Sequence, residues 1–234
     1  MAGNEYKLTA EKVRRREQRL RMLKIILIII VVLLSLLYIV LKLIYEVGNF
    51  TVTLDSSSNI RGALVIYEDR RQKLCLQTLK ADELEFMTNI AEEWIPRDIH
   101  NGPDGSNNGQ NYIAYTFYAE NQGEEVINYW TTIEITDVIK NADEAIRVKV
   151  IKENVETTYA KPSVNGDAEP GTKSFWDDGV VMLEQTKNFK PGEVHKYTVI
   201  IWIEGNDPQC LDDIIGGEVK MRMRLTEEHI EQQQ

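Results

Sequence analysis

Carboxylate side chains gather in one short stretch of the sequence, EGNDPQCLDD at residues 204–213. The acids of this stretch are Glu204, Asp207, Asp212 and Asp213. Carboxylate oxygens are the hard ligands that calcium prefers, so one interpretation is an extracellular calcium site, and calcium is the one cofactor that the pattern suggests. The other interpretation, which we favour, is a turn at Asn-Asp-Pro that leads into a single helical turn ending at Gly216 and Gly217.

Histidine and cysteine patterns give no support to catalysis. The three histidines, His100, His195 and His229, are far apart in the sequence, and the H-E-x-x-H arrangement of zinc proteases is absent. The G-x-S-x-G motif of hydrolases with a serine nucleophile is absent as well. Neither cysteine has a local setting that suggests a thiolate nucleophile. We therefore predict a protein that is not an enzyme, and an envelope hydrolase is the least favoured function.

The two cysteines, Cys75 and Cys210, are too few for a disulfide scaffold. Outside the cell they could form one disulfide bond, or they could be two small apolar residues without a bond; the sequence leaves both alternatives open. Among the four tryptophans, Trp130 and Trp202 fall within apolar strands and are expected in the core. Trp176, in the loop sequence SFWDD, is the candidate for an exposed contact with a glycan or a protein.

The stretch Ile25–Tyr45 is long and apolar enough to cross a membrane. It has one charge, Lys42, and no Gly or Pro. A hydrocarbon core about 30 Å thick needs about 20 helical residues. A secretory signal peptide is the alternative, but its apolar region is usually shorter, and bulky residues follow this stretch where a peptidase needs small ones. We favour a membrane anchor that is retained.

Charge is distributed unevenly along the chain. Residues 1–45 contain nine Lys/Arg and three acids, whereas the rest contains 18 Lys/Arg and 34 acids. Because eight of the nine cations precede the apolar stretch, the positive-inside rule places the N-terminus in the cytoplasm and the acidic part outside. An acidic domain excludes nucleic acid as a partner. The lipid bilayer is the expected partner of the basic residues before the stretch, which include Arg14, Arg15, Arg16, Arg19, Arg21 and Lys24.

The remainder of the chain alternates apolar and polar residues in short runs separated by turn formers. About ten or eleven strands without strand–helix alternation predict a mainly β fold, an antiparallel sandwich or jelly roll. The expected organisation is a basic cytoplasmic tail (1–24), a transmembrane helix (25–45), an extracellular β-sandwich (46–226) and a polar tail (227–234).

Several local expectations follow from the same patterns. Strands 62–68 and 73–79 flank a polar turn and are expected to form a hairpin, and a short helix is expected over 81–88. Strand 112–120 is expected to turn back into strand 126–138. In the last strand, Glu218–Thr226, the residues expected to face one way are Val219, Met221, Met223 and Leu225.

The C-terminal half also carries a pattern that resembles a known group of proteins. The pattern consists of KPGE at 190–193, VIIWIEGNDPQC at 199–210 and GGEVKM at 216–221, with Tyr-Thr-Phe at 115–117 and Asn121 upstream. It resembles uncharacterised envelope proteins of Gram-positive bacteria, which are similar to the TasA/camelysin group of exported surface and biofilm-matrix proteins. The resemblance implies a jelly-roll domain exported across the plasma membrane, and some members of the group polymerise by exchanging strands.

The chain differs from that group in two ways. It keeps what reads as an uncleaved anchor, and it offers no ligand set for the protease activity attributed to camelysins. The first hypothesis is therefore a single-pass surface protein that acts by interaction, through adhesion, attachment to a matrix, or assembly with envelope proteins or with itself. The alternative is an extracellular module that binds calcium through residues 204–213 or a glycan through Trp176.

Overall fold

The computed structural model describes residue 14 and residues 20–39, 50–55, 62–84 and 86–228. The chain divides into two compact units, Met1–Val47 and Gly48–Gln234. The first unit contains a helix over Leu20–Ile39, twenty residues with exposed side chains. This helix confirms the predicted apolar helix and is consistent with either a signal sequence or a membrane anchor. Residues 40–45 of the predicted span lie outside the described residues.

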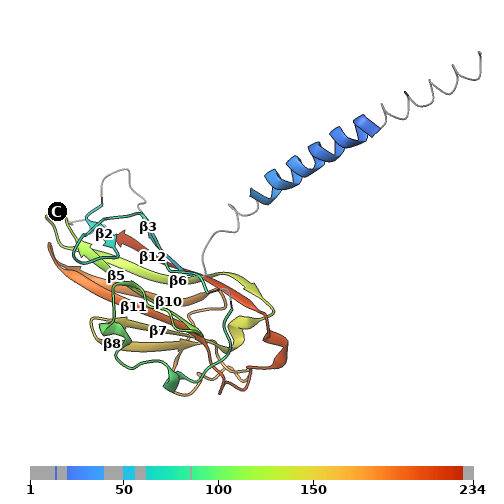
Figure 1. Ribbon diagram of the computed structural model, residues 1–234. Helices are drawn as coiled ribbons and strands as arrows, with labels where there is room; N and C mark the ends of the chain where they lie inside the picture. The colour runs from blue at the N-terminus through green and yellow to red at the C-terminus, as the bar shows by residue number, and fades with distance from the viewer. Residues whose placement is uncertain (1–13, 15–19, 40–49, 56–61, 85, 229–234) are drawn as a thin grey trace, which may run out of the picture. The chain divides into compact units, whose positions relative to one another are not determined.

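The second unit is a β-sandwich (Figure 1). Its first sheet has the spatial order β10 (Val180–Phe189), β6 (Ile127–Ile139), β12 (Glu218–Glu228), β1 (Phe50–Asp55), β3 (Thr78–Lys80). Its second sheet has the order β2 (Leu64–Tyr67), β5 (Tyr112–Asn121), β11 (Val194–Ile203), β7 (Ile146–Lys152), β8 (Val155–Ala160), β9 (Lys173–Ser174), with β4 (Gly105–Ser106) paired to β5. The predicted mainly β sandwich is confirmed.

Strand pairing is mixed rather than purely antiparallel. Most neighbours are antiparallel, but β1 pairs with β12 in parallel, with Phe50 opposite Met221, and β8 pairs with β9 in parallel. As a result, the first strand of the sandwich lies directly beside the last one. Because alternation in a strand reports only which face is buried, it could not reveal this parallel pairing.

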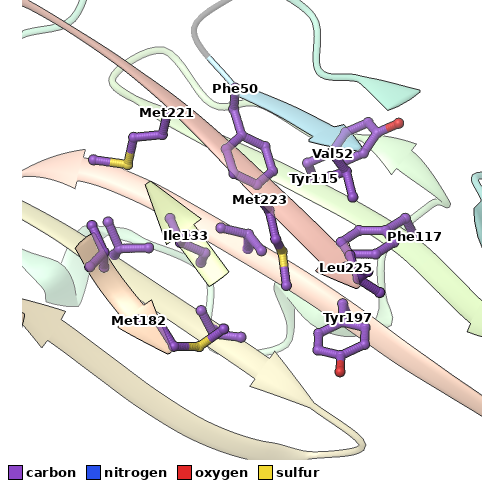
Figure 2. Close-up of a cluster of buried hydrophobic side chains, with 14 of the residues drawn as sticks. Phe50, Val52, Tyr115, Phe117, Ile133, Met182, Tyr197, Met221, Met223 and Leu225 are labelled. Carbon is purple, nitrogen blue, oxygen red and sulfur yellow. The ribbon is translucent and has the colours of Figure 1, made fainter. Parts of the chain in front are cut away.

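Apolar side chains from both sheets fill the space between them. In β12 the alternation expected from the sequence holds, since Met221, Met223 and Leu225 are buried. Figure 2 shows these three side chains packed with Phe50 and Val52 of β1 and with aromatic rings from the opposite sheet. Each fully buried side chain of this size contributes about 1.5–3 kcal/mol relative to an exposed one.

The second sheet also carries a smaller apolar cluster on its outer face. Trp202 of β11 is fully buried there, as expected from the sequence, and it packs in a cluster with Ile90, Ile95 and Ile99. These isoleucines belong to the segment that includes two short 3₁₀ helices, η1 (Glu92–Trp94) and η2 (Ile99–Asn101). Because this segment covers the sheet, β5 and β11 are buried on both faces, and their sequences are correspondingly apolar.

Three local expectations were wrong. Strands β2 and β3 do not form a hairpin, because they lie in different sheets and are joined only by a bridge between Ile66 and Leu76. The described residues within 81–88 form no helix. Strands β5 and β6 also lie in different sheets, so the turn between them connects the two layers of the sandwich. The apolar pattern of a strand does not say which sheet it joins.

Candidate functional site at one end of the sandwich

The first strand of the sandwich begins at one end of it, which we call the Phe50 end. β1 begins there, with Phe50 opposite Met221 near the start of β12. β6 ends there at Ile139, opposite Glu218, and β11 ends there at Ile203. The β6–β7 connection and the β11–β12 connection therefore both lie at this end. The β11–β12 connection, residues 204–217, contains the acids singled out in the sequence.

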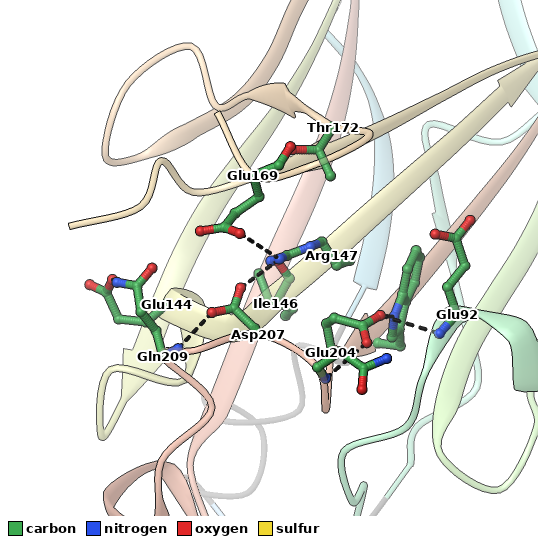
Figure 3. Close-up of polar contacts among 11 residues, drawn as sticks. Glu92, Glu144, Ile146, Arg147, Glu169, Thr172, Glu204, Asp207 and Gln209 are labelled. Atoms are coloured by element: carbon green, nitrogen blue, oxygen red, sulfur yellow. Dashed lines mark hydrogen bonds and ion pairs between the residues drawn. The ribbon is translucent and has the colours of Figure 1, made fainter. Parts of the chain in front are cut away.

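Glu204 acts as a structural acceptor within the β11–β12 connection. Its carboxylate accepts hydrogen bonds from the indole Nε1 of Trp202 at 2.9 Å, from the backbone N of Asn206 at 3.0 Å and from the backbone N of Glu92 at 3.2 Å. The residue is only 8% exposed. These bonds fasten the connection to β11 and to the η1 segment (Figure 3). The W-x-E spacing places acceptor and indole donor on the same face of the strand end.

Asp207 forms a buried ion pair with Arg147 of β7. An oxygen of Asp207 lies 2.5 Å from Arg147 Nη2, and its other oxygen accepts from the backbone N of Gln209 at 2.7 Å. Glu169 lies 3.9 Å from the same guanidinium nitrogen. All three charged residues are buried, and Figure 3 shows them converging from three separate segments. The arginine therefore holds two connections against β7.

A second set of charges continues the network at the surface. Lys161 Nζ donates to Asp143 and to Glu144, each at 2.7 Å, and Gln209 Nε2 donates to Glu144 at 2.8 Å. Burial alone would lower the pKa of Lys161, but its hydrogen bonds to Asp143 and Glu144 hold that pKa above the ordinary value. The lysine therefore remains a cation that joins the β6–β7 connection to the end of β8.

The four acids considered as a possible calcium site do not come together in that way. Glu204 and Asp207 are occupied by N–H donors and by an arginine, whereas Asp212 and Asp213 are exposed in the 3₁₀ helix η4 (Asp212–Ile214). Among the described residues, no group of three or more His, Cys, Asp or Glu side chains is placed to hold a metal ion. The turn and single helical turn favoured in the sequence describe this stretch better.

The two cysteines are free thiols rather than a disulfide. Cys75 is exposed, and Cys210 is half-buried in the β11–β12 connection. Burial raises the pKa of the Cys210 thiol, and the charges of Asp207 and Glu204 act in the same direction. Cys210 is therefore protonated at neutral pH, as expected for a small apolar residue rather than a nucleophile.

Exposed apolar side chains surround a cavity of about 230 Å³ at the Phe50 end. Phe86 (64% exposed), Leu211 (60%) and Ile215 (63%) line it, and together they form what we call the apolar rim. Met87 and Ile203 are among the other lining residues. The sequence analysis missed this surface because Phe86 was assigned to a helix and residues 211–215 were considered only for their acids and for a helical turn.

Two glycines position the part of the apolar rim that follows η4. Gly216 has φ +71°, a conformation that other residues rarely adopt. A Cβ on Gly217 would lie 2.7 Å from the Cβ of Ala142 and 2.7 Å from the carbonyl oxygen of Ile139. Lys140 Nζ also donates to the carbonyl oxygen of Ile215 at 2.8 Å. The connection is thereby held tightly against the end of β6.

Two of the three tryptophan expectations hold. Trp176 is 65% exposed and Trp202 is fully buried. Trp130, expected in the core, is only partly buried, because it alternates along β6 with the buried Tyr129. Trp176 precedes a tight turn in which an oxygen of Asp177 accepts from the backbone N of Gly179 and of Val180, each at 2.8 Å. Trp94, in η1, is 74% exposed and was not singled out.

The predicted interfacial cations are only partly described. Arg14, Arg21 and Lys24 are exposed, and the last two lie in the helix Leu20–Ile39. Arg15, Arg16 and Arg19 lie outside the described residues.

A buried titratable cluster near the start of β11 was not foreseen. The Tyr129 hydroxyl lies 2.6 Å from His195 Nδ1 and 2.7 Å from the Tyr197 hydroxyl, and His195 Nε2 lies 3.3 Å from Glu193. Burial lowers the pKa of His195, and the charge of Lys152 adds to this effect. The histidine is therefore neutral at pH 7, and it packs half-buried against the ring of Phe189.

No model of a known protein family matches the chain, and no curated protein matches it. Among solved structures, it is similar to a beta-glucosidase from Kluyveromyces marxianus in complex with glucose, with 11% identity, 68% of this chain and 15% of that chain covered, and a TM-score of 0.23. It is also similar to the N-terminal domain of PorA, with 10% identity, 70% and 96% covered, and a TM-score of 0.23. The chain thus spans 15% of the glucosidase's length, and neither likeness carries an argument at these TM-scores.

Proposed function

We propose that the chain is a single-pass plasma-membrane protein, with a cytoplasmic N-terminus and an extracellular β-sandwich, that acts by binding other molecules rather than by catalysis. The observation that carries this proposal is the helix Leu20–Ile39. Its twenty residues rise about 30 Å at 1.5 Å each, which matches the hydrocarbon core of a bilayer. The sandwich that follows has a hydrophobic core of its own.

Charge supports the orientation. Eight of the nine Lys/Arg of residues 1–45 precede Ile25, and Arg14, Arg21 and Lys24 are exposed. Cations on the N-terminal side of a span favour retention of that side in the cytoplasm. The acidic sandwich then lies outside.

The contacts of the acids and of His195 support interaction rather than catalysis. Glu204 and Asp207 fasten a connection, and His195 is half-buried beside Tyr129, within hydrogen-bond distance of its hydroxyl. Trp176 is an exposed contact for an envelope or matrix protein, or for a second copy of the chain. The resemblance to the TasA/camelysin group of surface and matrix proteins agrees with partners of this kind.

Anchoring is tested by the fate of the full-length protein in membranes. We expect the intact 27.0 kDa chain to remain in the membrane after a carbonate wash, and we expect protease added outside intact cells to digest the sandwich. Loss of the first ~50 residues from the mature protein would instead identify the helix as a cleaved signal sequence.

Binding is tested by Trp176→Ser in the full chain, with Trp94→Ser as the matched control because both indoles are exposed. The readouts are retention of the purified protein on isolated cell envelopes and its own association by sedimentation. We expect Trp176→Ser to weaken one of these about tenfold or more, as for an aromatic hot spot, and Trp94→Ser to change neither. Equal behaviour of the two variants would remove Trp176 as the contact.

A further inference from the structure

The apolar rim is unusual because three large side chains from two separate segments are exposed together. Phe86 comes from the segment after β3, and Leu211 and Ile215 come from the β11–β12 connection. Ile139, at the end of β6, is 43% exposed, and its carbonyl lies against Gly217 of the same connection. Clustered exposed apolar groups on a folded domain mark a surface that something else covers.

The rim lies at the end of the sandwich where the chain enters from the helix. Phe50 is the first residue of β1 and is fully buried, so this end of the sandwich is fixed to the chain that precedes it. Ten residues, 40–49, separate Phe50 from the helix end at Ile39. Ten residues span at most about 36 Å. A helix held in a bilayer therefore keeps the Phe50 end within this distance of the lipid.

We propose that the apolar rim inserts into the lipid interface of the bilayer that holds the helix, so that the sandwich rests on the membrane by its Phe50 end. This inference rests on the proposed membrane anchoring and adds the lipid surface as a direct ligand of the sandwich. Leu, Ile and Phe side chains enter the boundary between headgroups and acyl chains, where their apolar area leaves water.

Charge favours lipid over a second copy of the chain as the occupant. Asp212 and Asp213 are exposed between the rim residues Leu211 and Ile215, and Glu218 follows the same connection. Two copies that met rim to rim would place these acids against one another, which is unfavourable. The same acids disfavour anionic headgroups, so the rim is suited to neutral lipid.

The test uses the full chain in nanodiscs, with Cys75 and Cys210 replaced by serine and one nitroxide label at a new cysteine. The labelled variants are Ile215→Cys and Phe86→Cys, and the control is Leu74→Cys. Leu74 is 64% exposed, and its neighbour Lys73 pairs with Glu120, far from the Phe50 end. Power saturation measures the accessibility of each label to dissolved oxygen and to a water-soluble nickel chelate.

In neutral phosphatidylcholine we expect the accessibility of the rim labels to nickel to be about one third of that of the control label, or lower. We expect their accessibility to oxygen to be higher, as for groups at the acyl boundary. We expect this shielding to weaken when phosphatidylglycerol is added. Equal nickel accessibility at the rim and at Leu74→Cys would overturn the proposal. Shielding that appears only in anionic lipid would also overturn it. Shielding that appears with two chains per disc and not with one would overturn it too, and would identify a second copy of the chain as the occupant.

The outcome for anchoring is read separately. A chain that stays in the disc with water-accessible rim labels refutes the lipid contact and leaves the anchor intact. A chain that does not co-migrate with the disc overturns both proposals. Thermal unfolding of each labelled protein, compared with its unlabelled parent, checks that the label has not disturbed the fold.

Discussion

Replacing Arg147 by alanine would remove the cation from the buried network at the Phe50 end. The residue is 5% exposed, and its guanidinium lies 2.5 Å from Asp207 and 3.9 Å from Glu169. Arg147→Ala would leave two carboxylates in a region that water scarcely reaches. Removal of one member of a buried ion pair typically costs about 3–5 kcal/mol, because the remaining charge is desolvated without compensation.

The free energy of unfolding can be measured by urea titration of the full chain in detergent micelles. All four tryptophans belong to the sandwich, so their fluorescence reports its unfolding rather than that of the helix. With an m-value of about 2 kcal/mol/M, the expected loss lowers the urea midpoint by about 1.5–2.5 M.

Lys149→Ala is the matched control, because this lysine lies two residues along β7 and pairs with Glu92, whose side chain is 49% exposed. We expect it to cost less than about 1 kcal/mol. The triple variant Arg147→Met, Asp207→Leu and Glu169→Leu should recover most of the loss, since apolar residues can replace a group of buried charges. If Arg147→Ala cost no more than Lys149→Ala, the reasoning about buried charge would be refuted.

Three further predictions concern the histidine, the tight glycine and calcium. The pKa of His195 is lowered in the folded state, so near pH 6 the unfolded chain binds a proton at this residue more readily than the folded chain does. The free energy of unfolding should therefore fall as pH drops below about 6.5. In urea titrations from pH 7 to pH 5, His195→Gln should show a smaller slope; an unchanged slope would assign the effect to other groups. Gly217→Ala should cost about 1–3 kcal/mol because its Cβ would clash with backbone and with Ala142, whereas Gly179→Ala should be nearly neutral because its Cβ would meet only Asp177 Oδ1, at 3.7 Å; equal midpoints would contradict this. Millimolar calcium should leave the melting temperature unchanged, because the buried carboxylates of residues 204–207 already have donors; a rise on addition, reversed by a chelator, would restore the calcium interpretation.

The sequence predicted the faces of the strands better than their partners. In β12 the alternation identified Met221, Met223 and Leu225 as one buried face. It did not reveal that β5 and β6 belong to different sheets, because a turn of a few residues can join two strands of one sheet or the two layers of a sandwich. Pairing depends on contacts between residues that are distant in the chain.

The acids of residues 204–213 illustrate a second limit. Their clustering was visible in the sequence, but their function depends on partners elsewhere. Arg147 lies on another strand, and the backbone donor at Glu92 lies in a different connection. The composition of the stretch is compatible with a metal site and with an internal network of ion pairs and hydrogen bonds. The position of Arg147, which pairs with Asp207, decides in favour of the network.

The apolar rim could not be recognised because exposure is a property of the folded chain. Phe86 and Ile215 are apolar residues in segments that contain other apolar residues, and burial is the usual expectation for them. The structure shows instead that the ends of β6 and β11 leave them uncovered. A sequence pattern that distinguishes such a surface from the core was not present.

The parallel pairing of β1 with β12 has a consequence for how the protein is made. Phe50 and Val52 are synthesised before Met221 and Met223, which pair with them, and most of the sandwich sequence lies between the two strands. β1 can pair earlier with β3, its other neighbour, but the central strand of the first sheet is added only when β12 has been made. One edge of β1 therefore stays unpaired during most of the synthesis of the sandwich, and a chaperone or rapid export would protect this edge from aggregation.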